Sequence, residues 1–128
     1  MAHRFDTHYT RAEARALLPQ LRLWLDELLR HRDEVAKLDR RLEGPLASGQ
    51  DLGGDTVNRS ILLLAKMRTL FLEFHRREIQ IKDLDRGLID FPALINGREV
   101  FLCWEKDEDD VEFWHDIDTG FAGRERLD

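Results

Sequence analysis

The sequence has a single cysteine, three prolines, one tyrosine and no long apolar run. A lone cysteine cannot form a disulfide within the chain, and structural disulfides belong to oxidising compartments, so a reducing cytoplasm is favoured. No fully apolar run exceeds five residues, as in Ile61–Ala65, whereas about 20 are needed to cross a membrane. The first ten residues lack the apolar segment of a signal peptide. These absences predict a cytoplasmic protein without a membrane span.

Charge and length limit the partners and the architecture further. The 128 residues suffice for one domain, and we expect folding to bury about two-thirds of the extended surface. Hydrophobic residues make up 42% of the chain and charged residues 36%, which is typical of a globular protein. The net charge of −6 opposes binding to nucleic acid and to anionic lipid, because both are polyanions. We therefore predict a single domain, residues 1–128, with neither nucleic acid nor membrane as a partner.

A capping signal followed by a heptad pattern indicates a long first helix. Thr10 and Glu13 form an S/T-x-x-E capping box, so the helix should begin just after Thr10 and extend over residues 10–43. Mostly apolar residues then recur at alternating spacings of four and three, which predicts that the helix packs along a partner helix. These seam residues are Leu17, Leu21, Trp24, Leu28, His31, Val35, Leu38 and Leu42. Pro19 removes a backbone donor, and we expect a kink or a short break near Leu18.

A second helix is predicted over residues 55–77, after an exposed loop over residues 44–54 that is rich in glycine. Asp55 or Thr56 can cap it. Its apolar residues cover most of the circumference and leave a narrow polar stripe of Arg59, Lys66 and Glu73. A helix that is apolar nearly all round is expected to be buried nearly all round. One partner helix cannot cover it, so it should also contact a sheet, a second subunit, or both.

From about residue 78 the apolar period changes from helical to two, which indicates β-strands. Four strands are predicted, over residues 78–84, 88–95, 98–105 and 111–116. Asn96-Gly97 is a strong hairpin signal, because both central residues of its turn must tolerate positive φ. The chain therefore predicts an α+β fold: a long antiparallel helical hairpin packed on a four-stranded antiparallel β-meander, with a tail over residues 117–128.

The hairpin turn assigns side chains to the two faces of the sheet, because successive residues of a strand point to opposite sides. One face should carry Ile89, Phe91, Ala93, Val100, Leu102 and Trp104, and cover the second helix. If the acidic turn has four residues, Val111, Phe113 and His115 join that face. The opposite, half-solvated face should carry Lys82, Asp90, Cys103 and Glu112 in one row.

His115 is the most interesting single residue for chemistry. It ends the predicted apolar face of the sheet, next to Asp116 and close to Asp118. An imidazole next to carboxylates can act as a general base or bind a metal ion. The alternative is a capping histidine that hydrogen-bonds a loop carbonyl at the edge of the sheet. Both interpretations stay open, with the structural one favoured.

Three further side chains could carry chemistry: Cys103 and Lys82 as secondary candidates, and Arg124 as a further member of the candidate ligand site. Cys103 is flanked by carboxylates, which should raise the pKa of its thiol and make it a poor nucleophile, although redox sensing remains a weaker alternative. Lys82 could take part in a cation or thiolate site, or simply pair with Asp90 across two strands. Arg124 follows two glycines in the tail, and its guanidinium could hold a phosphate or carboxylate.

Four motifs in order resemble a family of short bacterial cytosolic proteins, the domain of unknown function 2203. They are the stretch from Lys82 to Pro92, Phe-Leu-Cys-Trp104, Phe-Trp-His115 and Gly-Phe-Ala-Gly-Arg124. The resemblance covers almost the whole chain and implies no particular activity or cofactor. The motif positions are Lys82, Asp83, Gly87, Asp90, Phe91, Cys103, Trp104, Trp114, His115, Gly120 and Arg124. At position 112 the family commonly has a small or neutral residue, whereas this chain has Glu112. This difference favours Asp90, His115 and Arg124 over Glu112 as site residues.

Two functional hypotheses follow from these patterns. The first is a non-enzymatic assembly module that forms a homodimer through the helices, with an interface that includes Trp24 or Leu28. The second is a small metal- or anion-dependent site formed by His115, Asp90, Asp118 and Arg124, which could be hydrolytic. It would bind a metal ion or a small molecule, whose identity the sequence leaves open.

Overall fold

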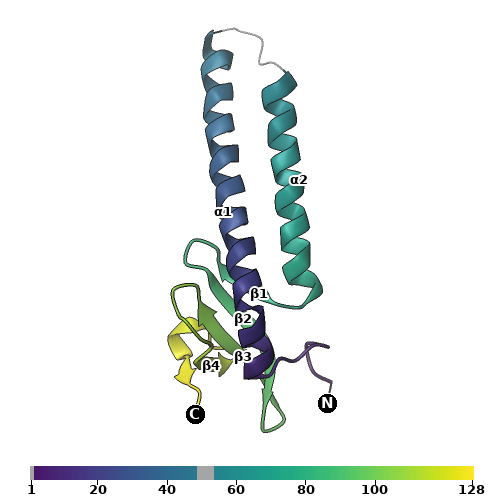
Figure 1. The fold of residues 1–128 in the computed structure, drawn as a ribbon, viewed down its shortest axis with the longest axis vertical. Helices are drawn as coiled ribbons and strands as arrows, with labels where there is room; N and C mark the ends of the chain where they lie inside the picture. Colours follow the sequence, from purple (N-terminus) through teal and green to yellow (C-terminus); the bar gives the residue numbers. More distant parts are fainter. Residues whose placement is uncertain (1, 49–53) are drawn as a thin grey trace. The chain divides into compact units, whose positions relative to one another are not determined.

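A computed structural model describes the backbone of residues 2–48 and 54–128. It describes the side chains of residues 2–43 and 54–128. Two helices, α1 (Arg11–Ser48) and α2 (Gly54–Arg76), precede a sheet (Figure 1). The sheet consists of β1 (Gln80–Asp83), β2 (Leu88–Ile95), β3 (Arg98–Glu105), β4 (Phe113–Asp116) and β5 (Glu125–Arg126), with the 3₁₀ turn η1 (Phe121–Gly123) before β5. The predicted α+β class is confirmed, and the tail adds a fifth strand that was not expected.

The chain divides into two compact units, which are treated separately below. The sheet unit comprises residues 1–23 and 73–128, and so holds the start of α1, the end of α2 and the whole sheet. The helical unit comprises residues 24–72, and holds the rest of both helices. No helix in the described part of the chain is long and apolar enough to cross a membrane.

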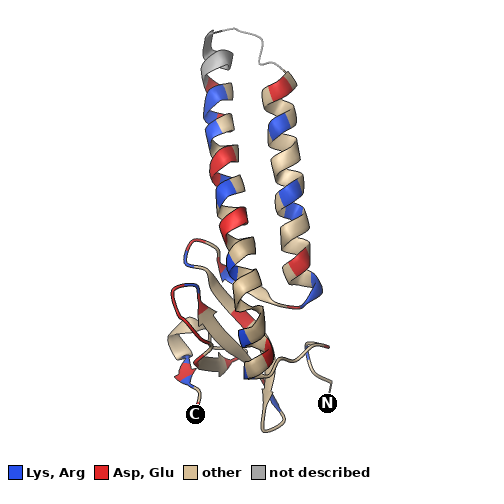
Figure 2. Cartoon of the chain, in the orientation of Figure 1, with Lys and Arg blue, Asp and Glu red and all other residues tan. Residues whose placement is uncertain are grey.

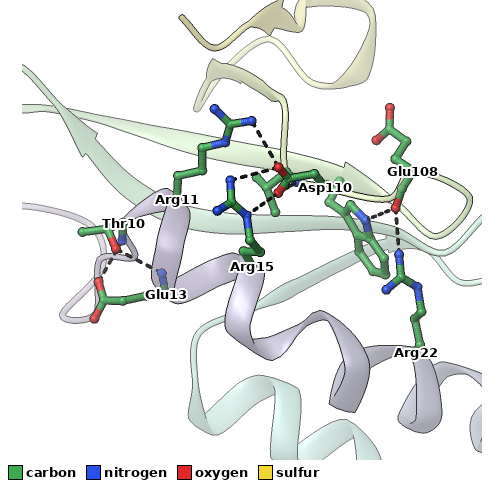
Figure 3. A network of polar contacts seen from close by, with 9 residues as sticks. Thr10, Arg11, Glu13, Arg15, Arg22, Glu108 and Asp110 are labelled. Atoms are coloured by element: carbon green, nitrogen blue, oxygen red, sulfur yellow. Dashed lines mark hydrogen bonds and ion pairs between the residues drawn. The ribbon is translucent and has the colours of Figure 1, made fainter.

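Helix α1 begins as predicted. The Thr10 hydroxyl accepts a hydrogen bond from the Glu13 amide at 3.1 Å, and the Glu13 carboxylate accepts one from the Thr10 amide at 2.9 Å (Figure 3). This reciprocal pair satisfies two amides that the first helical turn leaves free. The same interaction lowers the pKa of Glu13, chiefly through the bond from the Thr10 backbone.

The expected break at Pro19 is absent, because α1 is continuous from Arg11 to Ser48. A proline inside a helix costs about 3 kcal/mol. Burial of the neighbouring Leu18 and Leu21, at roughly 1.5–3 kcal/mol each, outweighs that cost. The predicted end at residue 43 is also wrong, since α1 continues through residues 44–48. Most of the predicted loop, residues 49–53, lies outside the described residues.

In the helical unit, α2 buries one side and exposes another. Leu63 and Leu70 are buried, and Arg59 pairs with Glu34 of α1 at 2.5 Å. Ile61 is 59% exposed, however, and Leu64 is 52% exposed. The expectation that α2 is buried nearly all round is therefore wrong for the chain by itself. One neighbouring helix can cover only one stripe of a helix surface.

The sheet is an antiparallel meander in the order β1-β2-β3-β4-β5. Strands β2 and β3 pair in the predicted register, with Ile95 opposite Arg98 and Ile89 opposite Trp104. Asn96 and Gly97 both have positive φ, 53° and 78°, as the hairpin turn requires. The strongest short-range signal in the sequence is thus confirmed.

One face of the sheet is buried as predicted, and the start of α1 contributes to its cover. Its buried side chains are Ile89, Phe91, Ala93, Val100, Leu102 and Trp104. The Arg22 guanidinium of α1 stacks 5.2 Å from the centre of the Trp104 ring, and Arg22 donates to the Glu108 carbonyl at 2.8 Å. The start of α1 can reach the sheet because the acidic loop after β3 binds its arginines.

Strand β4 is displaced by one residue from the predicted pairing. Cys103 lies opposite Phe113, not opposite Glu112, because the connection from β3 spans residues 106–112 rather than four residues. A one-residue slip moves every side chain of a strand to the other face. His115 and Phe113 therefore join the face of Asp90 and Cys103, and leave the face to which they were assigned.

This second face is buried at its centre, although it was expected to be half-solvated. Asp90 and His115 are each 1% exposed. The N-terminal arm, residues 2–10, packs Phe5 against Phe101 with ring centres 5.4 Å apart. The Glu99 carboxylate accepts hydrogen bonds from the Arg4 and Phe5 amides, which holds the arm on the sheet. The second face therefore encloses polar groups that have little access to water.

Candidate functional site

Three neighbouring strands bring one aspartate, one cysteine and one histidine together. Asp90 of β2 lies opposite Cys103 of β3, and His115 of β4 lies two residues beyond the partner of Cys103. One ligand atom from each residue, a carboxylate oxygen, the sulfur and a ring nitrogen, lies within 4.8 Å of the others. All three residues are buried. This set is called the Asp-Cys-His cluster below.

Both ring nitrogens of His115 have partners. Nδ1 lies 2.7 Å from the Asp116 carbonyl oxygen, and Nε2 lies 2.9 Å from Oδ2 of Asp90. A carbonyl oxygen can only accept, so Nδ1 carries a hydrogen. One further proton must then lie between Nε2 and Oδ2, either on the carboxyl group or on the ring. The pair holds a proton that a metal ion could replace.

Asp90 is only half satisfied. Its Oδ1 atom is buried and has no hydrogen-bond partner among the described residues. Burial raises the pKa of Asp90, while His115 and the Cys103 thiol act in the opposite direction. An unpartnered buried acceptor costs about 1–3 kcal/mol. Such an atom, close to two other ligand atoms, is a reason to expect a ligand.

Cys103 is a protonated thiol in this setting. Burial, and next the negative charge of Asp90, raise its pKa to about 12. The sequence predicted the direction of this shift, but from carboxylates alone, and burial is the larger cause. A thiol of this pKa forms little thiolate near pH 7, which disfavours a rapid redox sensor. A metal ion can still bind its sulfur, because coordination deprotonates a thiol.

A pocket of about 250 Å³ opens beside the cluster. Asp90 and His115 line it, whereas Cys103 does not. The remaining lining residues are Lys82, Leu88, Phe101, Ile117, Asp118, Thr119, Gly120 and Phe121. The cluster therefore has one side enclosed by the sheet and another side that faces a small cavity.

Two of the predicted candidates lie at this pocket. The Lys82 ammonium is 5.3 Å from the centre of the Phe101 ring, and Gln80 rather than Lys82 lies opposite Asp90. The Asp118 side chain is 85% exposed and pairs with Arg4 at 3.3 Å. Asp118 is thus on the outer part of the pocket, away from the buried ligand atoms.

Arg124 is not among the residues that line the pocket. Its guanidinium pairs with the Glu108 carboxylate at 2.6 Å and stacks 3.6 Å from the centre of the Phe113 ring. It also lies 4.6 Å from the centre of the Phe121 ring. These contacts hold the tail on the sheet. The structure therefore places Arg124 apart from Asp90 and His115.

The acidic loop, residues 106–112, has a structural use that the sequence did not reveal. Asp110 binds Arg15 at 2.8 Å and Arg11 at 3.3 Å (Figure 3). The hydrogen bond from Arg15 is the main reason that the pKa of Asp110 is lowered. The indole of Trp104 donates to the Glu108 carbonyl at 2.9 Å. These contacts fix the path of the loop, and so the position at which β4 begins. No local sequence pattern identifies them.

A second group of possible ligands is formed by His3, His8 and Glu99. His8 Nε2 lies 2.7 Å from the Glu99 carboxylate, whose oxygens also accept two amides of the N-terminal arm. The Glu99 oxygens are therefore already used to hold the arm. The Asp-Cys-His cluster, with its unpartnered oxygen and its pocket, is the better candidate for a metal ion.

The donor set of the cluster fits a zinc-type ion. Nitrogen, oxygen and sulfur ligands together are typical of divalent zinc, which binds histidine, carboxylate and cysteine. Metal-binding histidines usually donate their other ring N–H to a carbonyl or carboxylate, as Nδ1 of His115 does to Asp116. Asp90, Cys103 and His115 could therefore hold such an ion.

The fold and the cluster define the class: a small α+β protein with a helical hairpin, a five-stranded antiparallel meander and a buried Asp-Cys-His cluster. Residues 7–127 match the family described as an uncharacterized conserved protein, DUF2203, so the chain belongs to that family. This match confirms the resemblance found in the sequence motifs. No curated protein and no solved structure matches the chain.

Proposed function

We propose that this protein binds one divalent transition-metal ion of the zinc type through Asp90, Cys103 and His115. The observation that carries the proposal is that three buried ligand atoms lie within 4.8 Å of one another. Nδ1 of His115 is bonded to the Asp116 carbonyl, which leaves Nε2 facing Asp90. The unpartnered Oδ1 of Asp90 supports it, since coordination would satisfy that oxygen.

Charge balance also supports a divalent ion. Before binding, the cluster holds a thiol and one proton shared by Asp90 and His115, so it carries no net charge. Binding replaces both protons by one divalent ion and leaves a carboxylate and a thiolate, which again sum to zero. A buried site avoids the large cost of an uncompensated charge in this exchange.

The number of protein ligands favours a site that can also bind a small molecule. Zinc is usually four-coordinate, and sites with three protein ligands keep the fourth position for water or substrate. Asp90 and His115 line the pocket while Cys103 does not, so the fourth position is expected on the pocket side. The proposed role is a metal-dependent binding protein of the cytoplasm.

A zinc titration with a matched pair of variants tests this proposal. Asp90→Asn keeps the side-chain shape, and its amide can donate to Nε2 of His115, but it removes the carboxylate ligand. Asp118→Asn makes the same charge change at the exposed rim of the pocket. Isothermal titration of chelator-treated protein should give one ion per chain. Asp90→Asn should weaken zinc binding more than about 100-fold. Mutation of a residue that only hydrogen-bonds to a metal ligand already lowers metal affinity about 10–100-fold.

Asp118→Asn should bind zinc like the unmodified chain. The proposal is overturned if the unmodified chain takes up no stoichiometric zinc, cobalt or nickel. It is also overturned if Asp90→Asn, shown to be folded by circular dichroism, binds zinc as tightly as Asp118→Asn does.

A second candidate function, homodimeric assembly, has its own supporting observation. Six large apolar side chains of α2 are exposed. Five of them, Val57, Ile61, Leu64, Phe71 and Leu72, are called the exposed seam, and the first four recur at spacings of four, three and seven. Leu62, the sixth, lies on another side of the helix at 100° per residue. Figure 2 shows how few charged residues interrupt this part of α2. An apolar seam with heptad spacing is typical of a helix that packs on another helix.

We infer that the partner is a second copy of the chain, packed antiparallel along α2. The first turn of α2 carries Asp55 and its last turn carries His75 and Arg76. An antiparallel pair brings the acidic start of one helix near the basic end of the other, and opposes the two helix dipoles. Leu28 is fully buried within its own chain, so we place the interface on the exposed seam of α2 rather than at Trp24 or Leu28.

Leu64→Glu tests this interface better than a change at Leu28. Thr69→Glu is its control, because it adds the same charge to an exposed position about 140° around the helix, at 100° per residue. Sedimentation should show a dimer for the unmodified chain and for Thr69→Glu, and a monomer for Leu64→Glu. A monomeric unmodified chain at micromolar concentration contradicts the dimer, as does a Leu64→Glu variant that stays dimeric.

A further inference from the structure

We propose that the pocket beside the Asp-Cys-His cluster binds a small monoanionic carboxylate, with the carboxylate on the bound metal ion and near the Lys82 ammonium. This inference rests on the proposed metal site and names the class of molecule that the site accepts. It is carried by the charge, the apolar lining and the size of the pocket, which are considered in turn.

The charge of the loaded pocket favours a monoanion. A divalent ion with the Asp90 carboxylate and the Cys103 thiolate sums to zero. Lys82 is the one cation that lines the pocket, and it forms no ion pair with any of the described residues. Asp118 is the other charged group at the rim, but it pairs with Arg4 and is 85% exposed, so water screens it. One carboxylate would neutralise the remaining positive charge.

The lining of the pocket favours a molecule with an apolar body. Leu88 and Phe101 are buried side chains on its wall, and Ile117 and Phe121 complete the apolar part. Ligand pockets commonly combine such a wall with a few polar groups that set the orientation of the ligand. The polar lining residues here include Asp90 and His115, which would hold the metal ion, and Lys82, whose ammonium can attract a carboxylate.

The volume of the pocket limits the ligand to a small molecule. About 250 Å³ corresponds to roughly eight water molecules at about 30 Å³ each. This space accepts a short branched or aromatic carboxylic acid. It is too small to enclose a whole nucleotide or a peptide segment.

Lys82, not Arg124, is the residue that can meet the anion. Arg124 was expected to hold an anionic group, but its charge is already balanced by Glu108, and it does not line the pocket. Lys82 is exposed and lies over the ring of Phe101, with a flexible stem that can bring its ammonium over the pocket. It also acts on the buried carboxyl group of Asp90 through its charge.

A spectroscopic titration of the cobalt-loaded protein tests the inference. Cobalt(II) occupies zinc-type sites, and its visible absorption changes when a ligand enters the coordination shell. The probe is isobutyrate, and the control is isobutyramide, which has the same shape without the charge. Isobutyrate should change the spectrum with at least about tenfold higher affinity than isobutyramide, and Lys82→Met should remove most of that difference.

The cobalt affinity of Lys82→Met is measured in the same titration, so that carboxylate affinities are compared between fully loaded proteins. If the unmodified chain binds no cobalt, the proposed metal site itself fails. If cobalt binds but isobutyrate leaves its spectrum unchanged, the metal site stands and the carboxylate inference fails. Equal isobutyrate affinities for the unmodified chain and for Lys82→Met would overturn the role of Lys82.

Discussion

At the scale of single residues, the buried pair of Asp90 and His115 is the costly feature of this protein. Burying two ionisable groups loses their hydration, and their mutual attraction offsets that loss only when their other polar atoms are also satisfied. Oδ1 of Asp90 is not satisfied within the described chain. An apolar pair in the same place would often be as stable or more stable. The presence of this buried pair is therefore better explained by ligand binding than by folding.

The affinity for zinc should depend steeply on pH. Burial raises the pKa of Cys103 to about 12, so its thiol is protonated near neutral pH, and the contact between Nε2 of His115 and Oδ2 of Asp90 holds a second proton. Zinc must displace both protons, and its affinity should fall about 100-fold when the pH falls by one unit. Isothermal titration in buffers of different ionisation enthalpy counts the released protons directly.

Cys103→Ala supplies the control for this pH dependence. It removes the thiol but keeps the proton shared by Asp90 and His115, so its weaker zinc affinity should change only about tenfold per pH unit. An affinity that does not change between pH 6 and pH 8 contradicts the assigned ligands.

At the scale of elements, the sequence correctly predicts the strand pairings that depend on neighbouring residues. It fails for a strand whose position is set by contacts between residues far apart in the sequence. The hairpin of β2 and β3 follows from Asn96-Gly97, and its register is correct to the last pair. The position of β4 depends on the path of the loop over residues 106–112, which is held by the ion pair of its Asp110 with Arg15 of α1, far away in the sequence. No local pattern reveals such a contact. The sequence therefore names Asp90, Cys103 and His115 as candidates but places His115 on the wrong face.

The close approach of two turns around Gly87 provides a test at this scale. Gly87 has φ 66°, and a Cβ atom there would lie 2.4 Å from Cβ of Lys106. Gly97 has φ 78° with no atom within 4 Å of the corresponding position. Ala at either site incurs roughly 1–2 kcal/mol for the left-handed conformation. Only Gly87→Ala adds a steric overlap, and it should lose at least about 2 kcal/mol more than Gly97→Ala does.

Urea denaturation of the two variants measures this difference in the free energy of unfolding. Because Lys106 begins the loop that positions β4, Gly87→Ala should also weaken zinc binding, whereas Gly97→Ala should leave it unchanged. Equal losses of stability in the two variants would show that the turn moves away from Lys106 without cost.

At the scale of the whole molecule, the two proposed activities belong to different units. The ligands Asp90, Cys103 and His115 and the pocket all lie in the sheet unit, residues 1–23 and 73–128. The exposed seam of α2 lies in the helical unit, residues 24–72. A ligand stabilises the state that binds it by mass action, by about 2.7 kcal/mol at 100 times its dissociation constant. Zinc should therefore protect the strands of the sheet unit from amide exchange more than it protects α2.

A double-mutant cycle between Asp90→Asn and Leu64→Glu tests whether the two units act independently. Distant sites without shared partners usually show additive effects, within about 0.5 kcal/mol. We expect Leu64→Glu to leave the zinc affinity unchanged, and Asp90→Asn to leave the dimer dissociation constant unchanged. The zinc affinity is measured by calorimetry and the dimer constant by sedimentation, for both single variants and for the double variant. A coupling free energy above about 1 kcal/mol would mean instead that dimerisation and metal binding control each other, since such coupling is reciprocal.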